Sequence, residues 1–161
     1  MKTLWTPWRM EYIEGKASGK GCFFCAAPDL AHSAEDLILY RDRLLVVLMN
    51  RFPYASGHLL VSPARHVADI GELTSEESNA LAAMLQRCTA ILRRQLKPDG
   101  FNIGLNLGEV AGAGVASHLH WHIVPRWHGD HNYMTVLAEV RTIPEHIDNT
   151  FSRLLPEFQA Q

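Results

Sequence analysis

One stretch in the C-terminal half of the chain decides its fold: Ser117-His118-Leu119-His120-Trp121-His122-Ile123-Val124-Pro125-Arg126. Histidine alternates here with apolar residues, and a β-strand sends successive side chains to opposite faces. The pattern therefore predicts a strand with three histidines on one face and Leu119, Trp121 and Ile123 packed on the other. Same-face neighbours on a strand stand roughly 6.5–7 Å apart, so one small anion can contact two of the rings.

The three histidines also suit catalysis near neutral pH. Neutral imidazole is a nucleophile and titrates close to pH 6.5, so a cluster can divide the work of attacking, polarising and protonating a substrate. A single histidine on a strand is more often an ordinary solvent-facing residue. Three in register favour an active site.

Four further aliphatic runs, each bounded by turn residues, predict the remaining strands at residues 37–40, 44–49, 58–62 and 101–106. Arg41-Asp42-Arg43 is a short turn between the first two, and the first three strands form a predicted β-meander. Together with the histidine strand they make an antiparallel sheet of about five strands.

Two helices are predicted beside this sheet. Thr74 and Glu77 form a Thr-x-x-Glu capping box ahead of apolar residues at helical spacing, which predicts a long helix from Thr74 to Leu96. A C-terminal helix is predicted within residues 143–158, with Pro144 near its start and Pro156 shortening it. The predicted fold class is α+β.

The size and composition of the chain predict a single domain over residues 1–161. At 161 residues and 47% apolar content the chain can bury one sizeable core. A net charge of −2 gives no basic surface for a nucleic acid or an anionic membrane. No apolar run approaches the length of a membrane span, and no hydrophobic signal segment precedes the first charges, so we expect a cytoplasmic protein.

The N-terminal part divides into an aromatic segment, which should pack, and a polar, glycine-rich linker at residues 14–21. The sequence Cys22-Phe23-Phe24-Cys25 follows, and its spacing suits a metal pair or a redox dithiol, or two buried cysteines beside core phenylalanines. Three cysteines do not make a secreted disulfide framework. A reducing compartment and metal binding are favoured.

A glycine-rich loop, residues 107–116, lies directly before the histidines. Its glycines allow backbone N–H groups to converge on an anion, although a plain surface turn is the simpler interpretation of such a loop alone. Its position before three histidines on one face favours a phosphate-binding loop. Arg126 is the one fixed cation expected near the histidines, so other donors must hold most of a phosphate substrate.

The run from His118 to Val124, His-x-His-x-His followed by apolar residues, resembles the signature of the histidine triad family of nucleotide hydrolases and transferases. Residues 124–130 and the opening Leu4-Trp5-Thr6-Pro7-Trp8-Arg9-Met10 are most similar to its bacterial diadenosine tetraphosphate phosphorylase branch. The resemblance covers most of the chain and weakens towards the C-terminus. It implies a histidine triad fold and a homodimer.

The resemblance also implies roles for the histidines. His120 would attack the α-phosphorus of a nucleotide to give a nucleotidyl-histidine, and His122 would hydrogen-bond the phosphate or the leaving oxygen. Positioning and charge stabilisation would suffice without a catalytic cofactor. Zinc-bearing members use the first triad histidine as a ligand, which here implies a closed structural zinc site on Cys22, Cys25, His66 and His118.

Other residues match family positions around the nucleotide. Asn50 matches the asparagine that holds the ribose, Asn106 one at the end of the strand before the phosphate loop, and His58 a supporting position. The remaining nucleotide-binding candidates are Gly112, Gly114, Val115 and His122.

Gly114 departs from the family pattern, because many of the hydrolases have glutamine four residues before the first triad histidine. A glycine removes a donor and opens space beside His120, which favours inorganic phosphate as the acceptor. The family resemblance implies an adenine dinucleoside polyphosphate as the substrate. The alternatives are a hydrolase that uses water and a zinc-dependent nucleotide-binding protein with little turnover.

Overall fold

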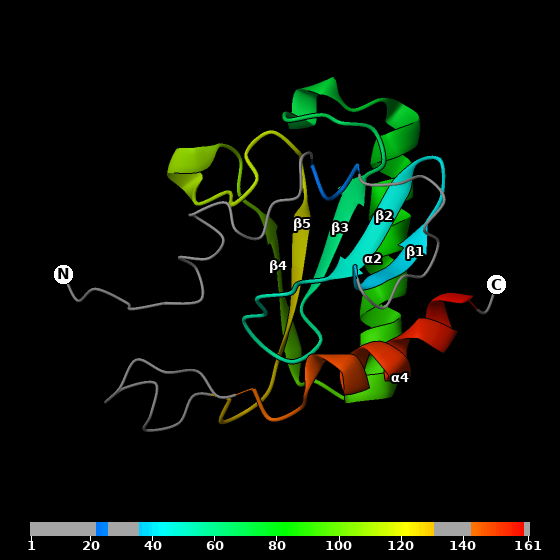
Figure 1. Ribbon diagram of the computed structural model, residues 1–161, viewed down its shortest axis with the longest axis vertical. Helices are drawn as coiled ribbons and strands as arrows, with labels where there is room; N and C mark the ends of the chain where they lie inside the picture. Colours follow the sequence, from blue (N-terminus) through cyan, green and yellow to red (C-terminus); the bar gives the residue numbers. More distant parts are fainter. Residues whose placement is uncertain (1–21, 26–35, 131–142, 160–161) are drawn as a thin grey trace.

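The computed structural model describes residues 22–25, 36–130 and 143–159 (Figure 1). Five strands form one sheet in the order β1-β2-β3-β5-β4, and every neighbouring pair is antiparallel. The strands are β1 Ile38–Arg41, β2 Leu45–Met49, β3 Leu59–Pro63, β4 Gly100–Leu105 and β5 Trp121–Arg126. The predicted α+β fold is confirmed, with strand boundaries shifted by a few residues.

The register of the sheet sets a row of residues across one face. Leu48 of β2 pairs with Leu60 of β3, Leu60 pairs with His122 of β5, and His122 pairs with Gly104 of β4. Directly paired residues point to the same face. The last triad histidine therefore stands between a buried leucine and a glycine.

The opposite face packs against the long helix α2, Ser75–Leu96, which runs along the sheet (Figure 1). The helix α4, Ile147–Gln159, lies near the lower end of the sheet in Figure 1 and contacts β1 and α2. The predicted capping box at Thr74 and Glu77 is present. The shared core includes Leu39, Val47, Leu59, Val61, Met84, Ile91, Leu92, Ile123, Phe151, Leu154 and Phe158.

The C-terminal helix differs from its prediction. It begins at Ile147, and Pro156 lies inside it and does not end it. A proline within a helix costs roughly 3 kcal/mol, but burying each large apolar side chain contributes about 1.5–3 kcal/mol. Leu154 and Phe158 are buried on either side of the proline, and the Arg87 guanidinium donates to the Phe158 carbonyl oxygen at 2.9 Å. Tertiary packing therefore stabilises the helix despite Pro156.

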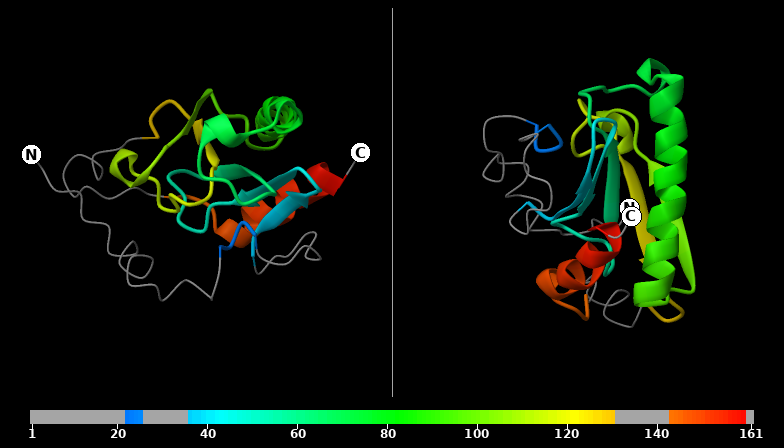
Figure 2. Two further views of the ribbon diagram at one scale, coloured as in Figure 1. Left: turned by 90° about the horizontal axis from the view of Figure 1, so that it is seen from above. Right: turned by 90° about the vertical axis from the view of Figure 1, so that its right-hand side faces the viewer.

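A second, smaller core lies on the face away from α2. Phe24 is fully buried there against Ile38, Val46, Leu48 and Leu60. Figure 2 shows residues 22–25 on the side of the sheet opposite α2. The predicted aromatic segment with Trp5, Trp8 and Tyr12, and the linker 14–21, lie outside the described residues.

The histidine strand is shorter than predicted. Its ladder begins at Trp121, so His118 and His120 precede it. Pairing with β3 stops at Val61, opposite Trp121. The residues just before Trp121 do not pair with β3. Instead, the Leu119 N–H donates to the Val67 carbonyl oxygen at 2.7 Å. The other short turns are η1, Ile70–Glu72, and η2, Glu109–Ala111.

Within the described residues, no helix combines the length and the apolar character needed to cross a membrane.

Candidate functional site

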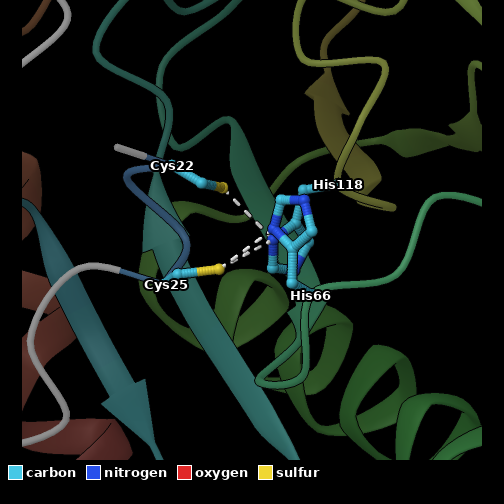
Figure 3. Close-up of side chains that lie close together, drawn as sticks. All are labelled: Cys22, Cys25, His66 and His118. Carbon is cyan, nitrogen blue, oxygen red and sulfur yellow. Dashed lines mark hydrogen bonds between the residues drawn. The ribbon is translucent and has the colours of Figure 1, made fainter. Parts of the chain in front are cut away.

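Cys22, Cys25, His66 and His118 lie together beside the carboxyl end of β3 (Figure 3). The four ligand atoms all lie within 4.8 Å of one another. Sulfur to Nδ1 distances are 3.2 Å for Cys22 to His118, 3.4 Å for Cys25 to His118 and 3.2 Å for Cys25 to His66. A tetrahedral zinc with Zn–S of about 2.3 Å and Zn–N of about 2.0–2.1 Å separates such atoms by about 3.5 Å. The residues fit zinc in both chemistry and spacing.

His118 is held in the form that a metal requires. Its Nε2–H donates to the Pro63 carbonyl oxygen at 2.9 Å, which leaves the lone pair on Nδ1, beside the two sulfurs. The ring is fully buried, and this burial lowers the pKa of His118 below its usual value. The Ser62 hydroxyl fixes the next residue by donating to the Leu119 carbonyl oxygen at 2.9 Å.

His120 is fixed through its other ring nitrogen. Its Nδ1–H donates to the His118 carbonyl oxygen at 2.8 Å. Burial lowers the pKa of His120, although the bond to the His118 carbonyl opposes that shift. At neutral pH the ring is therefore uncharged, with its nucleophilic lone pair on Nε2.

A chain of hydrogen bonds fixes the proton of His122. The Tyr54 backbone N–H donates to Nδ1 of His58 at 3.1 Å, so that His58 carries its proton on Nε2. Nε2–H of His58 then donates to Nδ1 of His122 at 2.9 Å. His122 must therefore carry its own proton on Nε2 and acts as a hydrogen-bond donor there.

The same two rings stay neutral over a wide pH range. Burial lowers the pKa of His58 to about 3, with smaller contributions from His122 and His120. Burial also lowers the pKa of His122 to about 4, helped by His120. Since both values lie far below 7, the donor arrangement holds at neutral pH.

A cavity of about 1070 Å³ opens beside His122. Its lining includes Tyr54, Gly104 and Asn106. The Tyr54 ring stacks on His122 with centroids 5.9 Å apart. A Cβ added to Gly104 would meet nothing within 4 Å, so this part of the sheet leaves room for a ligand next to the histidine.

The glycine-rich loop differs from the expected phosphate cradle. Gly108 and Gly112 have positive φ angles of 84° and 91°, which glycine adopts without strain. The N–H groups of Gly112 and Ala113 donate within the loop, to the carbonyl oxygens of Glu109 at 2.9 Å and Gly108 at 3.3 Å. These two groups are therefore used by the turn and do not form the expected anion site.

Two other backbone N–H groups of this loop lie nearer to His118 in the sequence. Within residues 107–130, which the structure describes, the N–H groups of Val115 and Ala116 have no hydrogen-bond partner. Val115 packs partly against the second core, and the Asn106 amide braces the loop by donating to the Gly112 carbonyl oxygen at 3.2 Å. The two N–H groups of Val115 and Ala116 are therefore candidate anion donors.

Two polar candidates, Asn50 and Arg126, make hydrogen bonds within the protein. Asn50 accepts from the Phe52 N–H at 3.0 Å, and its amide nitrogen lies 3.3 Å from Nδ1 of His58. Asn50 thus supports the histidine chain. Arg126, expected as the cation near the triad, is ion-paired with Asp130 at 2.5 Å and donates to Asn102 at 2.8 Å.

Sequence reasoning missed two residues of this site. Phe24 appeared in the sequence only as a possible core residue, in one of the alternatives for residues 22–25, yet its ring centroid lies 4.9 Å from that of His118 and 5.1 Å from that of His120. Tyr54 sits in a loop by composition but contributes both its ring and its N–H. The one sequence signal for a role of Tyr54 in the site is its position four residues before His58.

The comparisons with known proteins agree with this geometry. The HIT domain family model matches residues 31–129. An AP-4-A phosphorylase from Mycobacterium tuberculosis is 36% identical over 169 aligned positions that cover 100% of this chain and 86% of the relative. A bis(5'-adenosyl)-triphosphatase from Saccharomyces cerevisiae is 34% identical over 56% of this chain and 44% of its own length.

A solved structure shows the same fold with metal present. A Zn-bound histidine triad family protein from Mycobacterium smegmatis superposes with a TM-score of 0.65 at 29% identity, covering 86% of this chain and 94% of that protein. The fold, the three histidines and the family match lead to one conclusion. This chain belongs to the HIT domain family and is an enzyme of its nucleotidyltransferase or hydrolase type.

Proposed function

We propose that the chain cleaves dinucleoside polyphosphates by transferring a nucleotidyl group to His120 and then to inorganic phosphate. The observation that carries this proposal is the pair of fixed tautomers. His120 keeps its lone pair on Nε2 because Nδ1–H is bound to a carbonyl oxygen, and His122 keeps its proton on Nε2 because His58 donates to its Nδ1. One ring attacks and its neighbour donates.

The first step follows from these protonation states. The Nε2 lone pair of His120 attacks the α-phosphorus, a P–N bond forms, and the bond from phosphorus to the leaving polyphosphate oxygen breaks. The Nε2–H of His122 hydrogen-bonds the oxygen that gains charge. The His118 carbonyl oxygen keeps its bond to Nδ1–H, which stabilises the positive charge on the ring of His120.

The second step returns the enzyme to its starting state. An oxygen of the acceptor attacks the same phosphorus, the P–N bond breaks, and its electron pair returns to Nε2 of His120. With phosphate as acceptor the product is a nucleoside diphosphate. The N–H groups of Val115 and Ala116 are the donors that we assign to the phosphoryl oxygens, and Gly114 leaves space for a second anion.

The nucleotide site surrounds these groups. We assign the ribose to the region of Asn50, and the phosphates to His122 and the part of the loop at Gly114 and Val115. Asn106 and His58 support this arrangement. The adenine dinucleotide substrate is inferred from the relatives named above, whose names specify AP-4-A and a bis-adenosyl triphosphate.

The acceptor is tested by the products. Diadenosine tetraphosphate with phosphate is expected to give ADP and ATP, and omitting phosphate should slow turnover by about tenfold or more, since the second step loses its nucleophile. Chromatography of the nucleotides with and without phosphate is the measurement. Equal rates that yield AMP and ATP identify a hydrolase, and no product under either condition identifies a nucleotide-binding protein.

We further propose a structural zinc on Cys22, Cys25, His66 and His118. A Cys2His2 tetrahedron has no open position for water, and zinc there stabilises the fold. It would join residues 22–25 to the segment that carries the triad. His118 would then serve as a ligand and take no part in the chemical step.

A homodimer is the last part of the proposal. The strand β4 is an edge of the sheet, and Ile103 on it is 48% exposed, so β4 and the long helix α2 are the candidate surfaces. Sedimentation at micromolar concentration should give twice the chain mass of 18.1 kDa. Ile103→Lys should shift the equilibrium towards monomer, whereas a monomeric parent protein contradicts the proposal.

A further inference from the structure

Phe24 joins the candidate metal centre to the nucleophilic histidine. It lies between Cys22 and Cys25, its side chain has no exposed surface, and its ring packs on the second core. The ring of Phe23 lies against that of Phe24, with centroids 4.2 Å apart, but 44% of Phe23 is exposed. The two phenylalanines are adjacent in the sequence, but only Phe24 is buried.

The ring of Phe24 covers one face of His120. The two rings are stacked, with centroids 5.1 Å apart and an interplanar angle of 30°. His122 contacts the same imidazole edge-on, at 5.1 Å and 62°. The bond from Nδ1–H to the His118 carbonyl oxygen holds one edge of the imidazole. A single hydrogen bond leaves the ring free to tilt about it, and the stacked phenyl ring limits that tilt.

Two hydrogen bonds hold the backbone around Phe24. The Cys25 N–H donates to the Cys22 carbonyl oxygen at 3.0 Å, which closes a turn around residues 22–25. The Arg41 guanidinium donates to the Phe24 carbonyl oxygen at 3.1 Å. A metal bound by both thiolates would hold the same turn and so would restrict the position of the phenyl ring further.

We propose that Phe24 is a positioning residue for His120, through which the occupied metal centre raises the rate of the chemical step. This proposal rests on the proposed function for its catalytic part. The direction in which Nε2 approaches phosphorus decides the rate, and a displacement of about 1 Å can cost about 100-fold. Phe24 acts through His120 and does not itself contact the reacting atoms.

The test compares Phe24→Leu with Phe23→Leu in zinc-loaded protein. Leucine keeps the core apolar but removes the flat ring. Phe24→Leu is expected to lower kcat by about 10- to 100-fold with KM within about twofold, and to slow formation of the nucleotidyl-histidine by the same factor. Phe23→Leu should leave both unchanged. A kcat equal to that of the parent, or a rise confined to KM, overturns the proposal.

A second measurement does not depend on catalysis. Nitrogen NMR of histidine-labelled protein should show the Nδ1–H of His120 exchanging with water about tenfold faster in Phe24→Leu, and also in the parent protein after zinc removal. Elemental analysis must show equal zinc in both leucine variants. An unchanged exchange rate overturns the proposal even if turnover falls. A parent protein that forms no adduct contradicts the proposed function, whereas the exchange comparison still decides whether Phe24 fixes the ring.

Discussion

His120→Gln is expected to reduce the turnover of diadenosine tetraphosphate by about 10⁴-fold or more, the scale found when a catalytic nucleophile is removed. Glutamine is polar and of similar length, but its amide nitrogen has no available lone pair with which to attack phosphorus. The bond that His120 donates to the His118 carbonyl oxygen can be replaced by the amide N–H. The protein should therefore fold, and thermal melting should change by only a few degrees.

The matched control for this prediction is His146→Gln. The side chain of His146 is 72% exposed and pairs with Asp148 at 3.3 Å, on the surface of the described part of the chain. Its replacement should leave turnover within about twofold, since surface substitutions have small effects. Mass spectrometry of quenched reactions should find a nucleotidyl adduct on His120 in the parent and none in His120→Gln. Normal turnover in His120→Gln contradicts the assignment of the nucleophile.

The second large effect is expected at the metal centre. Cys25→Ser should weaken zinc binding by about 10²- to 10³-fold, because four ligands share the roughly 10–16 kcal/mol of a structural site. Protein purified without chelator should contain one zinc per chain before the substitution and much less after it. Competition with a chromophoric chelator measures the change in affinity.

Cys88→Ala separates the loss of metal from the loss of packing. Cys88 is a residue of α2 that has no exposed surface and lies in the shared core, where burial raises the pKa of its thiol to about 12. Both variants should melt at lower temperature, Cys88→Ala through a small cavity. Only Cys25→Ser should lose zinc. Full zinc content in Cys25→Ser, or none in the parent protein, contradicts the proposed site.

Local sequence patterns determined the regular elements of this protein. Thr74 and Glu77 indicated the start of α2, and the short aliphatic runs indicated the strands, because capping and period-two alternation depend on residues only a few positions apart. Pro156 shows the limit of such reasoning. Its local preference was overruled by Leu154 and Phe158, whose burial depends on α2 and β1.

The identities of the histidines were likewise evident from the sequence, but their protonation states were not. The proton positions depend on a carbonyl oxygen of Pro63 for His118 and on His58 for His122, partners 55 and 64 residues away. Hydrogen-bond partners at that separation are set by strand pairing, as when β3 brings His58 beside β5. The tertiary structure alone therefore decided which ring nitrogen carries a lone pair.

The sequence by itself thus determined the fold class, the family resemblance and the residue types of the triad and of the cysteine pair. The tertiary structure decided that four metal-ligand atoms gather within 4.8 Å, that the N–H groups of Gly112 and Ala113 are consumed by a turn, and that Phe24 covers His120. The physical reason is distance along the chain. Side-chain type and local periodicity depend only on residues that are close in the sequence. Ligand geometry, burial and hydrogen-bond partners are set only when distant segments pack together.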